Sequence, residues 1–545
     1  MIRAKFQSPL LQFAFLIALL SACSANPQGG SLTNTPAPAT AATAAENGSE
    51  DQPRTIFIGS SDEITSLDFA DANRTTEWEI LANLNIGLLT IEPGTANVIP
   101  GVATSFELSE DGLHYTFFLE SGWHYPDGSE LKAFDFVRGI SRSIRLDGSA
   151  SPIINPVIES TIARDDYTLE ITLQAPHGDF PQIVTSAAYM PLQEGQLPDD
   201  ELVIFPSSIG GVGAWQIVEF AQGEDIVFER NPNFKLGFAE DAPDRVILRS
   251  YEDPFMLATA IEAGEIDLAW RSIDLSSLED LKQTEEITVF NSAFGGTRTL
   301  LINHTDEFLR SRLVREALAR LIDRNEIVSK VFDGNASPLY SAVPPGYLGA
   351  NQAFLDLYGA TPDVTAADAL LAEAGYFEFE PIPLTLLYPQ DQYGLHSQEI
   401  AALLKNQLEQ SEAIQITLQP LDWITFLSSL LGSEYQLIYL GWSFDRYPDT
   451  SNYLETFALS EISSRIGIDY ALEEMDELLI AAGITPDQAE RAMLYEEAQN
   501  LVAQELVSLP LLFEPELVVW NNQRIANLVI GPVGYLHYEL ISLSD

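Results

Sequence analysis

Short runs in which apolar and polar residues alternate recur along most of the chain, and such runs are typical of half-buried β-strands. They fall at Thr55–Ile58, Tyr115–Leu119, Thr168–Leu173, Ile226–Glu229, Leu384–Tyr388, Ile414–Pro420 and Leu437–Leu440. Other segments repeat an apolar residue every three or four positions, as amphipathic helices do. These are Leu313–Leu321, Ala366–Ala374, His396–Leu408 and Gln488–Gln504. Because strands and helices interleave, we predict a mixed α/β fold with crossover connections.

The N-terminal segment has the layout of a secretory signal. Two basic residues, Arg3 and Lys5, precede the apolar stretch Leu10–Leu20, and small residues follow up to Cys23. The stretch is shorter than the roughly 20 residues that a membrane helix needs. Its end, Leu20–Cys23, resembles a bacterial lipobox, which implies cleavage before Cys23 and attachment of lipid to its thiol. We expect residues 1–22 to be a lipoprotein signal peptide and residues 23–54, rich in small and polar residues, to be the lipidated cysteine and a disordered linker.

Composition excludes several classes of protein. The chain has 545 residues with 80 Asp+Glu against 27 Lys+Arg, a formal net charge of -53. Nucleic acid is not expected as a partner, because its binding needs Lys and Arg to neutralise phosphates. We interpret the acidity as solvation of a large surface. Cys23 is the single cysteine, so a disulfide framework or a thiolate zinc site within one chain is excluded.

Local catalytic motifs are missing from the sequence. It has no zinc-binding His-Glu-x-x-His, no Gly-x-Ser-x-Gly elbow and no phosphate-binding Gly-x-x-x-x-Gly-Lys loop. Gly210, Gly211 and Gly213 approach a dinucleotide-binding turn but lack its third glycine. The histidines have no metal-ligand spacing, and we expect them to be surface or structural residues: His114, His124, His177, His304, His396 and His537. We therefore expect no enzymatic activity, no cofactor and no metal site, although catalysis by residues distant in sequence stays open.

One pair of carboxylates differs in its surroundings from the many others. Asp445 and Asp449 follow an apolar strand and lie among Trp442, Tyr447 and Tyr453. A strand end with aromatic neighbours suits a cleft that holds one cationic group against apolar walls. A turn carboxylate that caps the next segment is an equally good interpretation of these residues alone.

From about Thr55 to the C-terminus the chain resembles the solute-binding proteins of bacterial peptide ABC importers, the oligopeptide- and dipeptide-binding family (solute-binding protein family 5). The most specific block contains two Asp-Gly turns, Asp111-Gly112 and Asp127-Gly128, which would close hairpins around the strand Tyr115–Leu119. The matching segments follow one another in family order: Ser66–Asp68, Val98–Phe106, Glu110–Phe117, Tyr125–Ser129, Ala133–Val137, Gly264–Asp267, Val314–Leu318 with Ile322–Arg324, and Ala369–Tyr376. In the last of these, Gly375 suits a left-handed helix end.

The resemblance implies a periplasmic-binding-protein-like fold of two lobes, in the large three-domain form, with a hinged ligand cleft. It implies a discontinuous first lobe of residues 55–90, 205–292 and 506–545. An inserted domain would take residues 91–204 and the other lobe residues 293–505. Closure would then be a rigid-body motion in which few residues change conformation.

The resemblance also implies site residues. Asp445 falls at the family position that pairs with the N-terminal ammonium of a peptide. Tyr439, Leu440 and Gly441 lie where the family lends a strand to the peptide main chain, and Trp442 would wall the cleft. Arg298 could meet a carboxylate. Trp215 stands where the family has another aromatic residue and would reshape a patch near the lobe junction, a departure that leaves the ligand less certain than the fold.

These observations lead us to expect a monomeric, lipid-anchored binding protein on the outer side of the cell membrane. It would capture a peptide and deliver it to the permease and ATPase subunits of an ABC importer. Three alternatives stay open: the same fold binding an oligosaccharide or nickel, a receptor-like module that signals, and a secreted hydrolase or sugar-active enzyme.

Overall fold

The computed structural model describes residues 53–206, 208–220, 223, 225–271, 273, 277–390, 392, 396–443, 447–468, 470–531 and 533–544. The expected signal peptide, the lipidation site Cys23 and almost all of the expected linker lie outside these residues. Helices and strands alternate along the described chain, so the predicted mixed α/β class is confirmed. Within the described part, no helix combines the length and the apolar character needed to cross a membrane.

A large mixed sheet runs through the whole molecule. Its strands lie in the order β16-β15-β17-β13-β18-β12-β1-β11-β10-β9-β8, and β14 pairs with β18 outside this path. In chain order the strands are β1 (Thr55–Ser60), β8 (Ile209–Gly210), β9 (Trp215–Glu219), β10 (Ile226–Arg230), β11 (Arg245–Ser250), β12 (Leu268–Trp270), β13 (Ile287–Ile302), β14 (Ser337–Pro338), β15 (Ile382–Pro389), β16 (Ile414–Leu421), β17 (Leu437–Trp442) and β18 (Ser508–Asn521).

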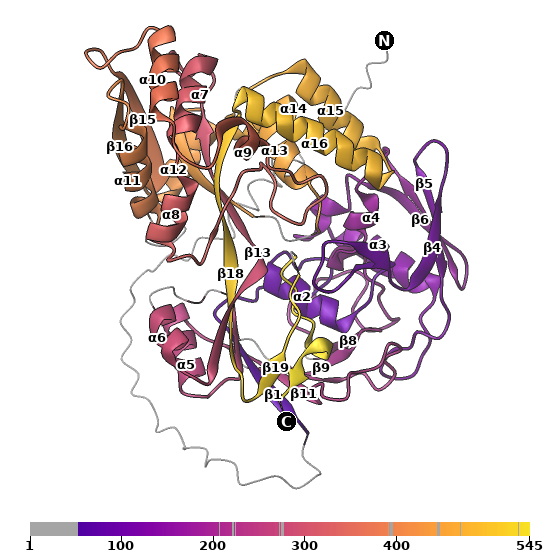
Figure 1. Cartoon of the computed structure of the whole chain (residues 1–545). Helices are drawn as coiled ribbons and strands as arrows, with labels where there is room; N and C mark the ends of the chain where they lie inside the picture. Colours follow the sequence, from indigo (N-terminus) through magenta and orange to yellow (C-terminus); the bar gives the residue numbers. More distant parts are fainter. Residues whose placement is uncertain are drawn as a thin grey trace.

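Two long antiparallel strands, β13 and β18, connect the two ends of this sheet (Figure 1). The first part of β13 pairs with the last part of β18, which also pairs with β12. The second part of β13 pairs with β17. Between these parts the register shifts at Asn291–Gly295, where the strand bulges. The long pair therefore joins two lobes, one built on β12, β1 and β11 and the other on β17, β15 and β16.

The first lobe, as named here, consists of the sheet from β12 to β8 with helices α2 (Thr75–Leu84), α5 (Pro254–Glu262) and α6 (Leu278–Gln283). The C-terminal tail returns to it in β19 (Ile525–Asn527) and β20 (Ser542–Leu543). Asn83 holds the tail to α2, because its Nδ2 donates to the Leu536 carbonyl at 2.9 Å and its Oδ1 accepts from the Tyr538 amide at 3.0 Å.

The second lobe covers β17, β15 and β16 with helices (Figure 1). Four of these helices begin at an aspartate that accepts a backbone N–H in the first turn, as Asp363 does from Ala366. The helices are α7 (Arg312–Leu321), α8 (Arg324–Val331), α9 (Ala353–Tyr358), α10 (Val364–Glu373), α11 (His396–Leu408), α12 (Trp423–Leu431), α13 (Ser451–Ala458), α14 (Ser460–Ser463), α15 (Glu473–Ile484) and α16 (Gln488–Glu505). The aspartates that cap this way are Asp323, Asp363, Asp422 and Asp487.

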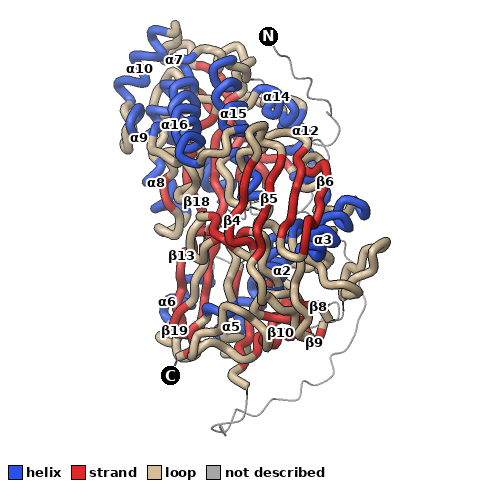
Figure 2. The backbone as a smooth tube through the Cα atoms, turned by 90° about the vertical axis from the view of Figure 1, so that its right-hand side faces the viewer, coloured by secondary structure: helices blue, strands red, loops and turns tan. Residues whose placement is uncertain are grey.

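A separate sheet, called the inserted sheet below, lies beside both lobes (Figure 2). Its order is β4-β5-β7-β6, with β4 (Ala103–Leu108), β5 (His114–Leu119), β6 (Ile158–Asp165) and β7 (Thr168–Leu173). The short pair β2 (Leu89–Ile91) and β3 (Val98–Pro100) precedes it, and α3 (Ala133–Leu146) and α4 (Phe180–Ile183) pack near it. The buried ion pair Arg142–Asp68, with N–O distances of 2.5 and 2.7 Å, ties α3 to the first lobe.

One hydrophobic cluster extends from Ile56 to Ile541 and includes residues of both lobes and of the inserted sheet. A second, smaller cluster lies between α5, β12 and α6. The strands and helices predicted from hydrophobic periodicity are all confirmed, with ends that differ by at most two residues. Asp111-Gly112 closes the turn between β4 and β5, whereas the turn at Asp127-Gly128 leads only to a single bridge, because β7 is the second partner of β5.

Candidate functional site

Tyr439–Gly441, the segment expected to lie along the main chain of a peptide, is in the second half of β17, at the joint between the lobes. β17 pairs with β13 along its whole length, with Gly441 opposite Arg298. On the other side, the described register with β15 covers Leu437 and Ile438. Tyr439–Gly441 therefore continues beyond the ladder with β15 and ends beside the two strands that connect the lobes.

The side chains of this stretch belong to the hydrophobic core. Tyr439 is 1% exposed and Leu440 is 3% exposed. Any contact between these two residues and a solute would therefore use their main chain. Recognition by strand addition uses main-chain groups, so burial of the side chains is compatible with the predicted role.

Trp442 is fixed at the end of the strand by three contacts. Its Nε1 donates to the Asn452 carbonyl at 3.2 Å, and its own carbonyl accepts from Thr297 Oγ1 at 3.1 Å. The ring packs edge-to-face on Phe457, with centroids 5.2 Å apart. The residue keeps partial exposure and is held rigidly by these contacts.

The two candidate carboxylates differ in what the structure says of them. Asp445 lies outside the described residues. Asp449 is buried, and its oxygens accept from both terminal nitrogens of Arg491 at 2.9 and 3.0 Å and from the Ser451 amide at 2.9 Å. Asp449 is thus a structural carboxylate at the start of α13, the second of the two interpretations that the sequence left open.

Arg298 already has a carboxylate partner within the chain. Its guanidinium forms an ion pair with Glu514 of β18, and its side chain is 12% exposed. Gly296 makes room for it, since a Cβ at Gly296 would lie 2.9 Å from Arg298 Nη1. Glu514 was not predicted from the sequence, although it and Glu516 interrupt a largely apolar run in β18, which was a usable signal.

Trp215 does not reach a surface. It is 0% exposed and packs edge-on against Phe238 at 5.5 Å, on β9 near the far end of the sheet. A fully enclosed ring offers no face to a solute in this conformation. The expectation that Trp215 shapes a ligand patch is therefore not supported, because the position was judged from its aromatic type without knowledge of its burial.

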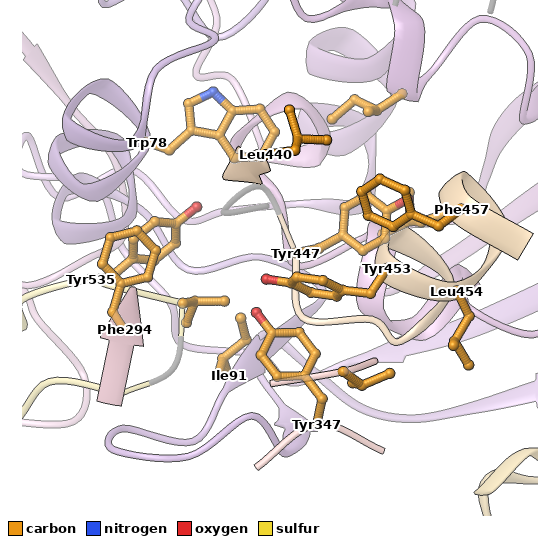
Figure 3. Packing of buried hydrophobic residues seen from close by; sticks show 14 of the residues in the cluster. Trp78, Ile91, Phe294, Tyr347, Leu440, Tyr447, Tyr453, Leu454, Phe457 and Tyr535 are labelled. Atoms are coloured by element: carbon orange, nitrogen blue, oxygen red, sulfur yellow. The ribbon is translucent and has the colours of Figure 1, made fainter. Parts of the chain in front are cut away.

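Aromatic side chains from distant parts of the chain gather in the cluster around β17 (Figure 3). Tyr347 and Tyr453 meet edge-to-face with centroids 5.3 Å apart. Phe294, in the bulge of β13, lies against Gly534, where any Cβ would collide with its ring. Tyr453 was selected from the sequence by its place near the strand end, whereas Tyr347 and Phe294 were missed because the chain has 19 tyrosines and 28 phenylalanines, too many for one to be selected by type.

The remaining chemical candidates have local structural roles. Each histidine is close to a partner in its own surroundings: Thr172 for His114, the Gly122 carbonyl for His124, Asp179 for His177, the Leu506 carbonyl for His304, Glu399 for His396 and Glu539 for His537. Gly211 and Gly213 pack so closely on Leu84 and Asn85 that a Cβ would collide. Among the described residues, no group of three or more His, Cys, Asp or Glu is arranged to hold a metal ion.

A small cavity of about 20 Å³ lies in the second lobe behind Trp442. It is lined by residues of β13, α13 and α16 and by the start of β18, among them Thr297 and Phe457. That volume holds about one water molecule and is too small for a peptide.

Comparison with known proteins places this arrangement in context. The family model described as bacterial extracellular solute-binding proteins, family 5 Middle, matches residues 97–464. The dipeptide-binding protein DppE of Bacillus subtilis is 25% identical over 552 residues, which cover 95% of this chain and 95% of that protein. The probable deoxycholate-binding periplasmic protein YgiS of Escherichia coli is also 25% identical, over 83% of this chain and 86% of that protein.

Among solved structures, the periplasmic binding protein DppA of Helicobacter pylori in complex with the peptide STSA superposes with a TM-score of 0.66. It is 23% identical, and the match covers 90% of this chain and 98% of that one. This likeness extends over both lobes and the inserted sheet, and it supports the two-lobed fold.

Proposed function

We propose that this chain, which belongs to the bacterial extracellular solute-binding proteins of family 5, captures a peptide between its two lobes for an ABC importer. The observation that carries the proposal is the position of Tyr439–Trp442, a strand end at the joint between the lobes that immediately precedes Asp445. A relative named as a dipeptide-binding protein, aligned along 95% of the chain, supports peptide as the solute class. In this role the protein delivers its solute to a membrane permease and catalyses no reaction.

The proposed contacts divide between main chain and side chains. The main chain of Tyr439, Leu440 and Gly441 lies along the peptide, and Trp442 covers one side of it. Asp445 holds the N-terminal ammonium. A charge-assisted hydrogen bond of this kind contributes about 1.5–3 kcal/mol. Arg298 contacts a solute only if it exchanges or shares its partner Glu514.

We further propose that the domains have the boundaries expected from the sequence, with β13 and β18 as the hinge. The boundary at 292/293 falls inside β13, at its bulge, because this strand is shared by both lobes. A bulge leaves a residue out of the ladder and so offers a place where two packed bodies can turn relative to each other. Lipid attachment at Cys23 would keep this body, a monomer, at the outer surface of the membrane.

A second solute class has one specific observation in its favour. YgiS, named as a probable deoxycholate-binding protein, is as similar in identity to this chain as the dipeptide-binding relative is. A sequence identity of 25% does not distinguish between these two solute classes, so the solute has to be measured.

A thermal-shift screen of residues 24–545 tests the proposal. Short peptides with free N-termini are expected to raise the melting temperature, because a ligand that binds only the folded state stabilises it. Free amino acids, oligosaccharides, nickel and deoxycholate serve as the competing classes. Stabilisation by one of these, with none by any peptide, would overturn the peptide assignment.

A further inference from the structure

The segment around α4, beside the inserted sheet, meets helices α15 and α16 of the second lobe at a close contact that contains few side chains. The Gly178 amide, just before α4, donates to the Gly483 carbonyl of α15 at 2.8 Å. Gln182 Nε2 of α4 donates to Gln488 Oε1 of α16 at 3.1 Å. A Cβ at Gly178 would collide with the Thr485 carbonyl oxygen, so the backbones approach as closely as they can. This contact is called the junction below.

Carboxylates face the junction from both sides. Asp179 comes from the inserted side, next to α4, and Asp449 and Glu455 come from the second lobe. A Cβ on Gly483, a residue of the junction, would lie 3.4 Å from Glu455 Oε1. The junction thus gathers three acidic groups, of which Asp449 is buried and Asp179 and Glu455 are partly buried.

Among the described residues, one arginine faces all three carboxylates, and its hydrogen bonds go to groups other than Glu455. Arg491 forms the bidentate pair with Asp449 and donates from Nε to the Ala482 carbonyl at 3.0 Å and from Nη2 to Tyr495 Oη at 2.8 Å. His177 lies 3.3 Å from Asp179. The other described neighbours with ionisable groups are the phenols of Tyr447 and Tyr495 in the second lobe and of Tyr115 and Tyr189 on the inserted side. One guanidinium therefore stands against three carboxylates.

We propose that the junction is a proton-linked latch: docking of the inserted sheet on the second lobe takes up one proton on Glu455, so that acidification tightens the contact and rising pH loosens it. The latch rests on the two-lobed fold and not on the identity of the solute. Glu455 keeps partial exposure, which gives its proton a path to solvent.

The electrostatics of the docked state support this assignment. Burial, together with the charges of Asp179 and Asp449, raises the pKa of Glu455 to about 8, despite the opposing charge of Arg491. Burial also acts to raise the pKa of Asp179, but the hydrogen bond with His177 and the charges of His177 and Arg491 lower it overall. The proton of the cluster is therefore held by Glu455 and not by Asp179.

The sign follows from comparing the docked and separated states. Separation removes the charge of Asp179 and the burial that the inserted side supplies, while Asp449 stays beside Glu455, so the separated residue has a lower pKa than the docked residue, which keeps its proton until about pH 8. Between the two pKa values the docked state binds one proton more. The docking equilibrium constant is therefore expected to fall by up to about tenfold for each unit of rising pH.

Hydrogen exchange of the whole body, residues 24–545, measures the junction directly. Protection of segments 178–183 and 483–488, corrected for the intrinsic exchange rate, is expected to fall as the pH rises toward about 8, by up to about tenfold per pH unit. In Glu455→Gln, a neutral residue of the same shape, protection should change by less than about twofold over the same rise in pH. Strand β7 serves as an internal reference, because its protection reports the inserted sheet itself.

Two further variants complete the experiment. Glu477→Gln removes an exposed carboxylate on α15 and should behave like the unchanged protein. Gly178→Ala should lose protection in both segments at every pH while β7 stays protected. The proposal is overturned if protection of the unchanged protein is flat from pH 5 to 8, if Glu455→Gln keeps the full pH dependence, or if Gly178→Ala leaves the junction protected.

Discussion

At the scale of single residues, buried arginines account for much of how an acidic chain folds. Arg142, Arg271 and Arg491 are almost completely buried, and each forms an ion pair with a buried carboxylate. These pairs join segments far apart in the sequence, such as Arg271 with Glu79 at 2.7 Å. A buried ion pair adds little to stability as a whole, but removal of one partner leaves an uncompensated charge in the core.

Arg491→Met tests this point. The variant leaves the buried carboxylate of Asp449 without its guanidinium, and the free energy of unfolding is expected to fall by about 3–5 kcal/mol. The matched control is Arg465→Met, whose partner Glu461 is largely exposed and for which the loss should stay below about 1 kcal/mol. Urea unfolding followed by circular dichroism measures both. Equal losses of unfolding free energy in the two variants would mean that burial of the Arg491–Asp449 pair does not increase the cost of removing its arginine.

At the scale of elements, every strand and helix predicted from periodicity is present, but periodicity missed others, among them β11, α3 and the two strands that connect the lobes. β13 contains the sequence Asn291–Gly296, which has the composition of a turn, and β18 contains Pro510 and Pro515. Proline lacks the N–H that a central strand donates, so a strand that contains it is judged unsuitable from sequence. The structure accommodates these residues at register shifts, with Pro515 opposite Gly295.

Some residues of the candidate site could be selected from the sequence and others could not. The strand end at Trp442 was found from an apolar run and aromatic neighbours, whereas Glu514, Glu455 and Arg491 were not. Their roles depend on contacts between segments that no local pattern records. Burial also decided against Trp215, and neither composition nor spacing reports burial of a single residue.

Gly295→Ala tests the connecting strands. A Cβ at Gly295 would collide with the Glu514 carbonyl oxygen, so β18 must shift, and we expect the free energy of unfolding to fall by about 1–3 kcal/mol. Gly483→Ala is the matched control, because it lies in α15 with no atom closer than 3.4 Å to the new Cβ. In a helix that change should be neutral or stabilising by up to about 1 kcal/mol. A loss of the same size in both variants would contradict close packing of β13 on β18.

At the scale of the whole molecule, two lobes share one sheet through a pair of strands, and the inserted sheet bridges to the second lobe at the junction. The net charge of -53 remains mainly on the surface, while aspartates also cap helices and pair with buried arginines. A large excess of negative charge keeps such a molecule soluble. Because carboxylates are so numerous, few positions allow a single one to bind a ligand selectively. The proposed role of Asp445 depends on its position in the sequence, three residues after the end of β17.

Calorimetric titration of residues 24–545 with a tripeptide from the thermal-shift screen, with its N-terminus free or acetylated, tests the central claim most directly. The unchanged protein should bind the free form more tightly. In Asp445→Asn, affinity for the free form should fall by about tenfold to a hundredfold, with less than a twofold change for the acetylated form. Asp200→Asn, an exposed aspartate of the inserted region, should bind like the unchanged protein. Equal affinities for the two forms in the unchanged protein, or equal losses in Asp445→Asn, would contradict capture of a peptide by its N-terminus.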